Sequence, residues 1–262
     1  MAEQAPASEP KASTVKIVGN ALWNEAKRYG SDTAALVAAP FHWDARDDWH
    51  AVGAAAMIGG AFWSDHAIYE TFQKYRSNFT NSVSSATTWY GGGGGFAVAG
   101  GLVVVGLLAG NNDVRDMGRD ALEAAIIAGT FTNLVIKPVA GRWRPSQSDG
   151  ETIFDPFSGH TSFTSGHATQ AFAVSSVIAM RSPGWIIPTI AYGLAFVVAC
   201  DRINDRAHFF SDVVTGALFA TATGRFLVRR HRAESAPLEP DRSKTIVEVV
   251  PIADGAALRI SW

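Results

Sequence analysis

Apolar residues gather in the middle of this chain, in six separate segments. The segments cover residues 49–64, 93–110, 119–137, 167–181, 184–200 and 211–228. Each is long enough for a helix, and none alternates between apolar and polar residues with a period of two. The pattern therefore predicts an all-α core. Ser182-Pro183-Gly184 allows only a tight turn, so the helices on either side of it should be antiparallel neighbours. The run from Gly91 to Gly95 is interpreted as a flexible connector before the second segment.

The two ends of the chain are polar and differ from this apolar centre. Residues 1–14 are predicted to be disordered, and residues 15–29 to form a short amphipathic helix. Near the other end, the β-prone runs TIVEVVPI and ALRISW flank a turn signal at Ala253-Asp254-Gly255. We therefore predict three regions: a polar N-terminal leader with a short helix at 1–48, a helical domain at 49–232, and a linker with a small C-terminal β-hairpin at 233–262.

The apolar segments raise the question of whether the chain enters a membrane. A membrane-spanning helix needs about 20 apolar residues. Segments 93–110 and 184–200 are apolar on all sides, which a helix on the surface of a soluble protein is not. Other segments carry polar residues, and the mean hydropathy of the whole chain is only +0.08. We favour an integral membrane protein, with a soluble helical bundle as the alternative.

Charge adds an orientation and excludes one class of partner. The net charge of −2 gives no reason to expect nucleic acid binding. If the helices span a membrane, one side carries a set of basic residues, which the positive-inside rule assigns to the cytoplasm. That set is Arg115, Arg119, Arg181, Arg225 and the run from Arg229 to Arg232. The clusters described next would then face the periplasm or the exterior.

Three polar clusters lie at the ends of apolar segments. The first, KPVAGRWRP, supplies Lys137, Arg142 and Arg144 at the end of the third segment. Arginine presents a planar fork that suits two phosphate oxygens, and lysine presents a point charge. This cluster alone would also fit a solvated basic loop, so its meaning depends on the other two.

The second cluster, SFTSGH, directly precedes the fourth apolar segment. Ser165 or Thr164 can cap that helix, and a helix N-terminus attracts anions. Gly166 lets the backbone approach a ligand closely, and His167 can give a proton to a leaving alkoxide. A second Ser-Gly-His at 158–160 has no apolar run after it, so we predict that it lies in a loop.

The third cluster, RINDRAHFFSD, contains Arg202, His208 and Asp212. Asp212 follows His208 by four residues, which places both on one face of a helix. A carboxylate on one ring nitrogen fixes the tautomer of the imidazole and makes the other nitrogen a better nucleophile. Arg202 adds a third cation to the set.

Taken together, the three clusters resemble the signature of the type 2 phosphatidic acid phosphatase (PAP2) superfamily, which is related to lipid phosphatases and bacterial class A acid phosphatases. The family pattern is K-x6-RP, then PSGH, then SR-x5-H-x3-D, and this chain reads KPVAGRWRP, TSGH and DRINDRAHFFSD. The resemblance covers roughly residues 50–228. It implies an all-α, six-helix bundle, with six spans in the membrane members.

The resemblance also implies roles for single residues. His208 would be the nucleophile that forms a phosphohistidine, Asp212 would orient it, and His167 would protonate the leaving group. The phosphate would be bound by five further residues: Lys137, Arg144, Ser165, Gly166 and Arg202. No cofactor and no metal is expected.

The expected activity is metal-independent hydrolysis of a phosphomonoester or pyrophosphate. The expected substrate is a phosphorylated lipid of the phosphatidic acid, polyprenyl pyrophosphate or lipid A type, or else a small phosphoester. The expected location is a bacterial-type inner membrane with a periplasm-facing site. The alternatives are a soluble periplasmic acid phosphatase of the same superfamily, a vanadium haloperoxidase, and a non-catalytic protein that binds lipid phosphates.

Two positions depart from the family pattern. Thr164 replaces the usual proline, and a threonine can still cap the helix. Asp201 replaces the usual serine before Arg202. A carboxylate there could repel phosphate or draw on Arg202, which bears on turnover or substrate choice more than on the type of reaction.

Overall fold

The computed structural model describes residues 14–147, 150, 152–235, 246–252 and 255–261. It divides into two units, Met1–Val228 and Arg229–Trp262, which are considered separately. The predicted disordered segment 1–14 lies outside the described residues apart from Thr14, which begins a helix.

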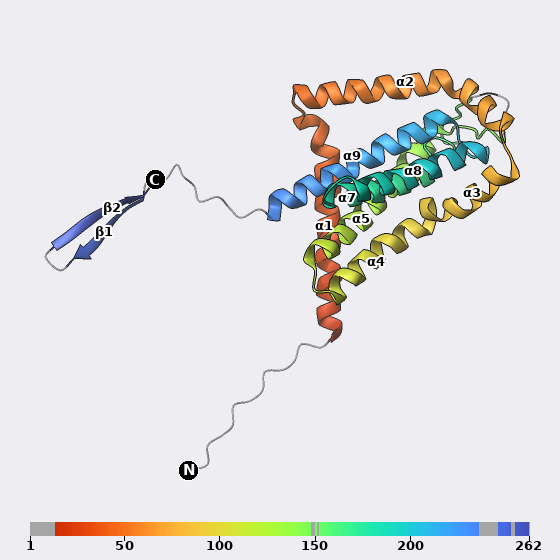
Figure 1. Ribbon diagram of the computed structural model, residues 1–262. Coiled ribbons are helices and arrows are strands. Elements are labelled where there is room, and N and C mark those ends of the chain that lie inside the picture. Colours follow the sequence, from red (N-terminus) through yellow and green to blue (C-terminus); the bar gives the residue numbers. More distant parts are fainter. Residues whose placement is uncertain (1–13, 148–149, 151, 236–245, 253–254, 262) are drawn as a thin grey trace, which may run out of the picture. The chain divides into compact units, whose positions relative to one another are not determined.

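The described part of the chain is mostly helical (Figure 1). The helical elements are α1 (Thr14–Ala38), η1 (Ala39–His42), α2 (Ala45–Lys74), α3 (Asn78–Trp89), η2 (Tyr90–Gly94), α4 (Gly95–Leu108), α5 (Asn112–Phe131), η3 (Thr132–Ile136), α6 (Lys137–Ala140), α7 (Gly166–Arg181), α8 (Ile186–Asn204) and α9 (Phe210–Ser235). The all-α prediction is confirmed, and each of the six apolar segments falls on a helix: α2, α4, α5, α7, α8 and α9.

Two helices differ from the sequence-based expectation. The first, α1, continues to Ala38, beyond the predicted end at residue 29. The other, α3, was not predicted, because its sequence NFTNSVSSATTW has no apolar run. A capping box starts α3: the Ser77 side chain accepts from the Thr80 backbone N–H, and the Thr80 side chain accepts from the Ser77 backbone N–H.

The glycine run does not form a flexible connector, so that prediction is wrong. These residues form a π-helical turn, η2, that joins α3 to α4, with a kink at Gly92 (φ −107°, ψ −129°). At Gly91 the helices pack so closely that a larger residue would not fit without a shift of its neighbours. A Cβ at Gly91 would lie 2.6 Å from a Val198 methyl and 2.9 Å from the His167 Cβ. The run therefore lets α3 and α4 approach α7 and α8.

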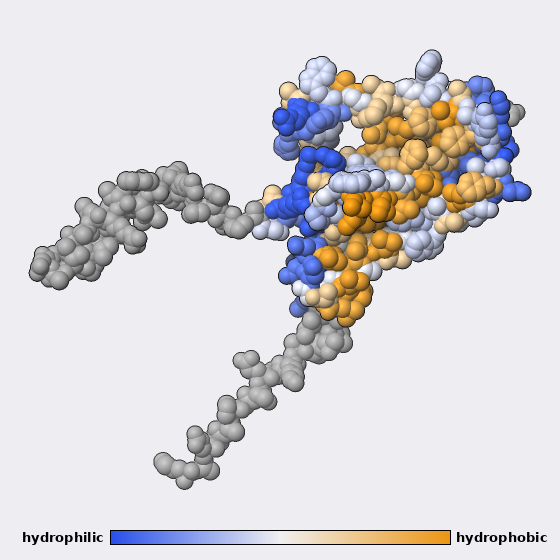
Figure 2. Space-filling view, viewed as in Figure 1, coloured by the Kyte–Doolittle hydropathy of each residue, from blue (hydrophilic) through white to orange (hydrophobic). Residues whose placement is uncertain are grey.

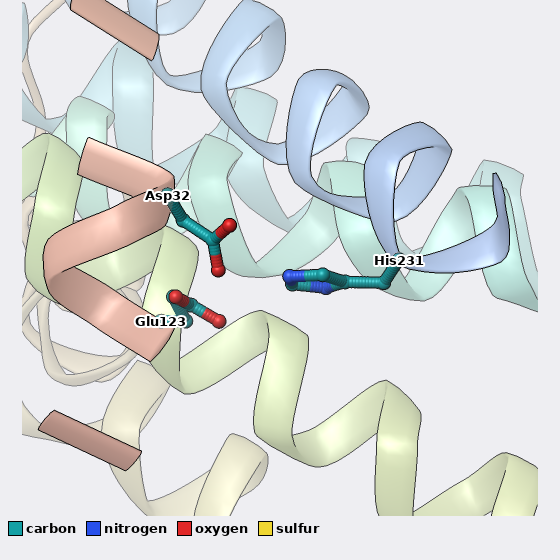
Figure 3. A group of neighbouring side chains, drawn as sticks. All are labelled: Asp32, Glu123 and His231. Atoms are coloured by element: carbon teal, nitrogen blue, oxygen red, sulfur yellow. The ribbon is translucent and has the colours of Figure 1, made fainter. Parts of the chain in front are cut away.

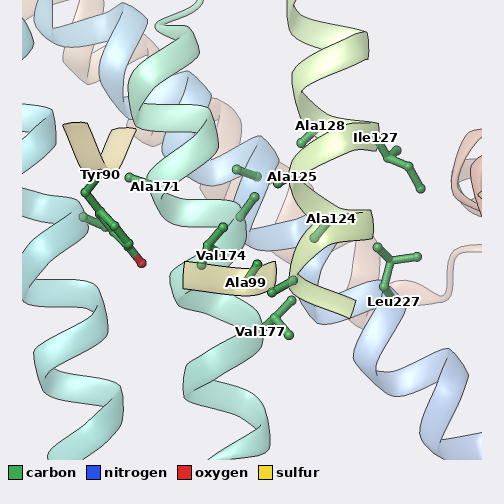
Figure 4. Close-up of a cluster of buried hydrophobic side chains, with 14 of the residues drawn as sticks. Tyr90, Ala99, Ala124, Ala125, Ile127, Ala128, Ala171, Val174, Val177 and Leu227 are labelled. Carbon is green, nitrogen blue, oxygen red and sulfur yellow. The ribbon is translucent and has the colours of Figure 1, made fainter. Parts of the chain in front are cut away.

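The core of the helical unit lies between α4, α5, α7, α8 and α9, and Figure 4 shows part of it. Alanine and valine dominate it: Ala99, Ala124, Ala128, Val174 and Val177 have no exposed surface. Small side chains allow helix axes to come close, which suits a bundle whose apolar faces are buried on several sides. The turn at Ser182-Pro183-Gly184 brings α7 and α8 together as predicted.

Some helices of this unit also present apolar residues to the outside. Within the described residues, three stretches are long and apolar enough to cross a membrane, judged by length and composition: Asn78–Leu108, Asn112–Ala140 and Ile186–Asn204. Leu108, the last residue of the first stretch, is 85% exposed, and Trp185, directly before the third stretch, is 75% exposed. Figure 2 shows apolar surface along the helices and polar surface near their ends.

The C-terminal unit contains the predicted β-hairpin. Strand β1 (Ile246–Ile252) pairs with β2 (Gly255–Ser261) in antiparallel register, from Ile246 opposite Ser261 to Ile252 opposite Gly255. The predicted turn residues Ala253 and Asp254 lie outside the described residues.

Candidate active site

The loop between α6 and α7 brings the three sequence clusters to one end of the helices. Two backbone hydrogen bonds hold it there. The Ser162 N–H donates to the Arg142 carbonyl at 3.0 Å, and the Ser165 N–H donates to the Asp212 carbonyl at 3.1 Å. The first bond joins the second cluster to the first, and the second joins it to the third. The structure therefore assembles the predicted site from three distant parts of the chain.

His208 lies just before α9 and is only 3% exposed. Its Nδ1 is 3.5 Å from Oδ2 of Asp212, which is fully buried in the first turn of α9. The same Oδ2 accepts from the Ser162 hydroxyl at 2.5 Å and from the Phe209 N–H at 2.9 Å. Because Nδ1 faces the carboxylate, Nε2 is the ring nitrogen left to act on a substrate.

The protonation states of this pair suit a nucleophile and its partner. Burial lowers the pKa of His208, and the charges of Arg144 and Lys137 lower it further, although Asp212 opposes them. Burial alone would raise the pKa of Asp212, but His208 and Arg142 outweigh it and the pKa is lowered. At neutral pH, the site therefore holds a neutral imidazole beside a carboxylate.

His167 occupies the first turn of α7. Ser165 is the N-cap of that helix and accepts from the Ala168 N–H at 3.4 Å, as the sequence predicted. Burial lowers the pKa of His167 to about 4, aided by the nearby charges of Arg202, His208, Lys137 and Arg144. The two histidines and the three predicted cations thus lie close enough to influence one another.

Two of the cations approach the N-terminus of α7 and the loop before it. The Nζ of Lys137 lies 3.3 Å from the position that a Cβ would take at Gly166. The absence of a side chain at Gly166 thus leaves room for the amine beside the helix N-terminus, where anions bind. Arg144 donates to the Thr161 hydroxyl at 3.3 Å. Among the described residues, neither Lys137 nor Arg144 forms an ion pair.

The third cation, Arg202, is held at the end of α8. It donates to the Thr88 hydroxyl on α3 and pairs with Asp205 at 3.0 Å. Asp201, the residue that departs from the family pattern, is 4% exposed, and its carboxylate accepts a hydrogen bond from the Thr87 hydroxyl on α3. Adjacent residues of α8 are therefore anchored to adjacent threonines of α3, and the Asp201 carboxylate is engaged by a hydroxyl.

Asp212 lies among four buried residues to which the sequence assigned no role in the site: Asp65, Arg142, Ser162 and Ser211. We call Asp65, Arg142, Ser162, Ser211 and Asp212 the Asp212 cluster. Arg142 was expected in a basic loop, yet it is fully buried and contacts both carboxylates of this cluster. Asp65 comes from α2, far outside the three motifs. Its one sequence signal was a charge at the end of an apolar segment, which does not identify a partner.

Residues 121–235 match the family model of the PAP2 superfamily. This segment belongs to the PAP2 superfamily. It runs from α5 to the end of α9 and contains every motif residue of the site, from Lys137 to Asp212. Asp65 lies outside the PAP2 segment.

Two solved structures are similar to the chain. The crystal structure of Aquifex aeolicus LpxE shares 18% identity and a TM-score of 0.48, over 63% of this chain and 94% of that one. The crystal structure of a transmembrane PAP2 type phosphatidylglycerolphosphate phosphatase from Bacillus subtilis shares 17% identity and a TM-score of 0.48, over 82% of this chain and 98% of that one. No curated protein sequence matches significantly. The PAP2 assignment therefore rests on the segment 121–235 and its motifs.

Proposed function

We propose that this protein is a phosphatase that hydrolyses a phosphomonoester or pyrophosphate of a lipid through a phosphohistidine intermediate. One observation carries the proposal. A buried, neutral imidazole is backed by a buried carboxylate and lies within electrostatic reach of a second imidazole and three cations. A phosphate group is the ligand that needs this combination of positive charge and nucleophile.

In the first step, Nε2 of His208 attacks phosphorus, and the bond from phosphorus to the leaving oxygen breaks. Asp212 stabilises the positive charge that develops on the ring, as a carboxylate on the opposite nitrogen does. His167 takes up a proton from solvent when the phosphate dianion binds beside it, and it then gives that proton to the leaving oxygen. The products of this step are the dephosphorylated alcohol, or the shorter phosphate, and a phosphorylated His208.

In the second step, a water molecule attacks the phosphorus of the phosphohistidine. His167, which lost its proton in the first step, takes one from this water. The P–N bond breaks, inorganic phosphate leaves, and His208 returns to its neutral form. Both steps use only groups of the chain and water, so we expect no need for a metal.

The cations carry the electrostatic part of the catalysis in this proposal. Lys137, Arg144 and Arg202 would bind the equatorial phosphate oxygens, together with the backbone N–H groups that Ser165 and Gly166 present at the start of α7. Fixed charges aimed at developing negative charge usually supply the largest share of a rate enhancement. Burial is the main cause of the low pKa of His167, and the charges of Arg202, Lys137 and Arg144 lower that pKa further.

An apolar cavity supports a lipid as the substrate. It has a volume of about 320 Å³ and lies between α2, α3 and α8. Phe72, Phe79, Val83 and Phe196 are among its lining residues, and so is Asp201, the neighbour of Arg202. An acyl or prenyl chain in this cavity would lie next to the end of α8 that carries Arg202. Together with the three membrane-capable stretches, it favours a substrate that is held in a membrane.

We further propose that the site faces the periplasm from a bacterial-type inner membrane. The support is a group of arginines at helix ends away from the three motifs: Arg115 and Arg119 near the start of α5, and Arg181 at the end of α7. Positive charge of this kind marks the cytoplasmic side of membrane proteins.

The experiment that tests the function is a phosphate-release panel on the detergent-purified full chain. The substrates are phosphatidic acid, a polyprenyl pyrophosphate, a lipid A phosphate and the soluble p-nitrophenyl phosphate, each with and without EDTA. We expect release from at least one lipid, unchanged by EDTA. His208→Ala should lose at least about 1000-fold in rate, as removal of a nucleophile does.

His50→Ala is the matched control, because His50 is an exposed histidine on α2. It should keep the wild-type rate. Full activity of His208→Ala would refute the proposed mechanism. Bromide oxidation in the presence of vanadate and peroxide, without phosphate release, would instead identify a haloperoxidase.

A further inference from the structure

Arg142 is a fully buried arginine whose guanidinium lies between two carboxylates. One terminal nitrogen donates to Oδ1 of Asp212 at 2.6 Å and to the Ser211 hydroxyl at 2.6 Å. The other donates to Oδ2 of Asp65 at 2.7 Å. A guanidinium is planar and presents its donors in a fixed fork, so two acceptors on different helices are held in one geometry.

Three aromatic rings surround this guanidinium. Its central carbon lies 4.2 Å from the ring centroid of Phe209, 5.0 Å from that of Phe62 and 5.1 Å from that of Phe154. Aromatic faces attract a cation and exclude water. Because water is excluded here, it cannot screen the charge of Arg142, and the attraction between the guanidinium and the two carboxylates is strong.

Asp65 anchors the far side of the arginine. Besides Arg142, it accepts from the Ser211 N–H at 2.7 Å and from the Ser211 hydroxyl at 2.6 Å. Ser211 directly precedes Asp212, so α2 is tied both to the arginine and to the first turn of α9. Burial raises the pKa of Asp65, and the hydrogen bonds from Arg142 and Ser211 oppose that rise.

These contacts fix the orientation of the Asp212 carboxylate. Its Oδ1 is held by Arg142, and its Oδ2 accepts from Ser162 and faces Nδ1 of His208. We propose that Arg142, anchored by Asp65, is a positioning residue: it keeps Asp212 ionised and aimed at Nδ1 of His208, so that Nε2 faces the substrate. This inference rests on the proposed function, and it assigns roles to two residues outside the motif pattern.

Removing the arginine should impair the chemistry more than substrate binding. Without it, two buried carboxylates face each other with no cation between them, which favours protonation of one. A protonated Asp212 cannot stabilise a positive imidazole. In Arg142→Gln we therefore expect kcat to fall about 100-fold, the order of loss that a misplaced catalytic group causes. KM should change less than about 3-fold.

The pH profile separates positioning from a general structural role. Loss of Arg142 raises the pKa of Asp212, so activity should begin to fail at a higher pH as the solution is acidified. The acid limb of kcat/KM should thus move upward in Arg142→Gln. Arg142→Lys keeps the charge and should restore the wild-type position of the limb, with a kcat between the two.

The variants are compared only after thermal unfolding shows that they fold. If Arg142→Gln does not fold, Asp65→Asn serves as the second variant, since it leaves Arg142 paired with Asp212 and should lower kcat about 10-fold by loosening the anchor. Wild-type kcat and an unshifted acid limb in the folded variants would overturn the proposal. So would a loss confined to KM.

A measurement that needs no turnover keeps this test independent of the proposed function. The ¹⁵N shifts of the His208 ring report which nitrogen carries the proton. We expect an Nδ1–H tautomer in wild type and in Arg142→Lys, and a mixture of tautomers in Arg142→Gln. If the wild type releases no phosphate from any substrate but shows this pattern, the function fails and the positioning role stands. The same tautomer in all three proteins would refute the role.

Discussion

Two buried groups of charged residues lie in the helical unit, and they differ in how their charges are balanced. One is the Asp212 cluster at the site. We call the other the Asp120 cluster, which consists of Arg28, Asp32, Asp120, Glu123 and Arg181. Each arginine of the second group faces carboxylates: Arg28 lies 2.9 Å from Asp120 and 2.6 Å from Glu123, and Arg181 donates to Asp120 at 2.7 Å. Figure 3 shows Asp32 and Glu123 directed toward each other from α1 and α5.

The Asp212 cluster also pairs an arginine with two carboxylates, but its surroundings are different. His208 lies against Asp212, and Lys137 and Arg144 add positive charge without ion pairs among the described residues. Buried ion pairs alone therefore do not mark a site. The distinguishing features are an imidazole beside a paired carboxylate and cations that remain available to a ligand.

The largest effect should be a loss of activity when one of the cations beside the Asp212 cluster is removed. Arg144→Gln removes a cation that contacts no carboxylate, so we expect kcat/KM to fall about 100-fold to 1000-fold while the melting temperature stays near that of wild type. Arg144→Lys, which keeps the charge but not the fork, should lose less. Steady-state kinetics and thermal unfolding in the same detergent measure both quantities. A large drop in melting temperature with normal kinetics would make Arg144 structural.

The opposite result is expected in the Asp120 cluster. Arg28→Met leaves Asp120 and Glu123 without one of their cations in a buried place, which should cost about 3 kcal/mol of stability. The folded fraction should keep kcat/KM within about 3-fold of wild type. Arg46→Met, at an arginine on the exposed start of α2, is the control for loss of a charge. Loss of turnover in folded Arg28→Met would show that the two clusters are coupled.

A smaller loss of kcat should follow when a side chain is added at Gly91, in the η2 turn that packs against His167. A Cβ at Gly91 would lie 2.9 Å from the Cβ of His167, whereas a Cβ at Gly93 would meet nothing within 4 Å. We expect Gly91→Ala to displace His167 and lower kcat about 10-fold. Gly93→Ala should leave it unchanged. Equal kinetics in the two variants would mean that the turn does not position His167.

The smallest effect is a shift in protonation. Burial and the neighbouring cations hold the pKa of His167 near 4, so the free site has a neutral imidazole at pH 7. A bound phosphate dianion offsets those cations and should raise the pKa of His167, so the ring binds a proton from solvent that it can give to the leaving group. NMR titration of the ring with and without inorganic phosphate measures this change. An unchanged or lower pKa with phosphate bound would exclude His167 as the acid.

The sequence predicted most of the helices and the motif residues because both depend on local patterns. Apolar runs mark helices, and Ser165 directly before such a run marks a cap. These features are set by neighbours in the chain, so they can be recognised without a structure. The spacing predicted that His208 and Asp212 share one face of a helix; that prediction is wrong for His208, which precedes α9, although its Nδ1 still lies 3.5 Å from Asp212.

What could not be predicted depends on contacts between distant segments. Asp65 lies 77 residues before Arg142, and only packing of α2 brings them together. Arg142 is one of three basic residues in its cluster, and nothing in its spacing distinguishes a buried residue from a solvated one. The glycine run was misjudged for the same reason: its role is set by His167 and Val198, which pack against it from other helices.

The most direct test of the account is to trap the phosphorylated enzyme. The full chain is mixed rapidly with ³²P-labelled lipid substrate, quenched in base, where phosphohistidine survives, and mapped by mass spectrometry. We predict phosphate on His208 within one turnover. In His167→Ala the phosphohistidine should accumulate further if water attacks it more slowly than the substrate transfers its phosphoryl group to His208. Rapid phosphate release with no labelled protein, or a label on a residue other than His208, would contradict the account.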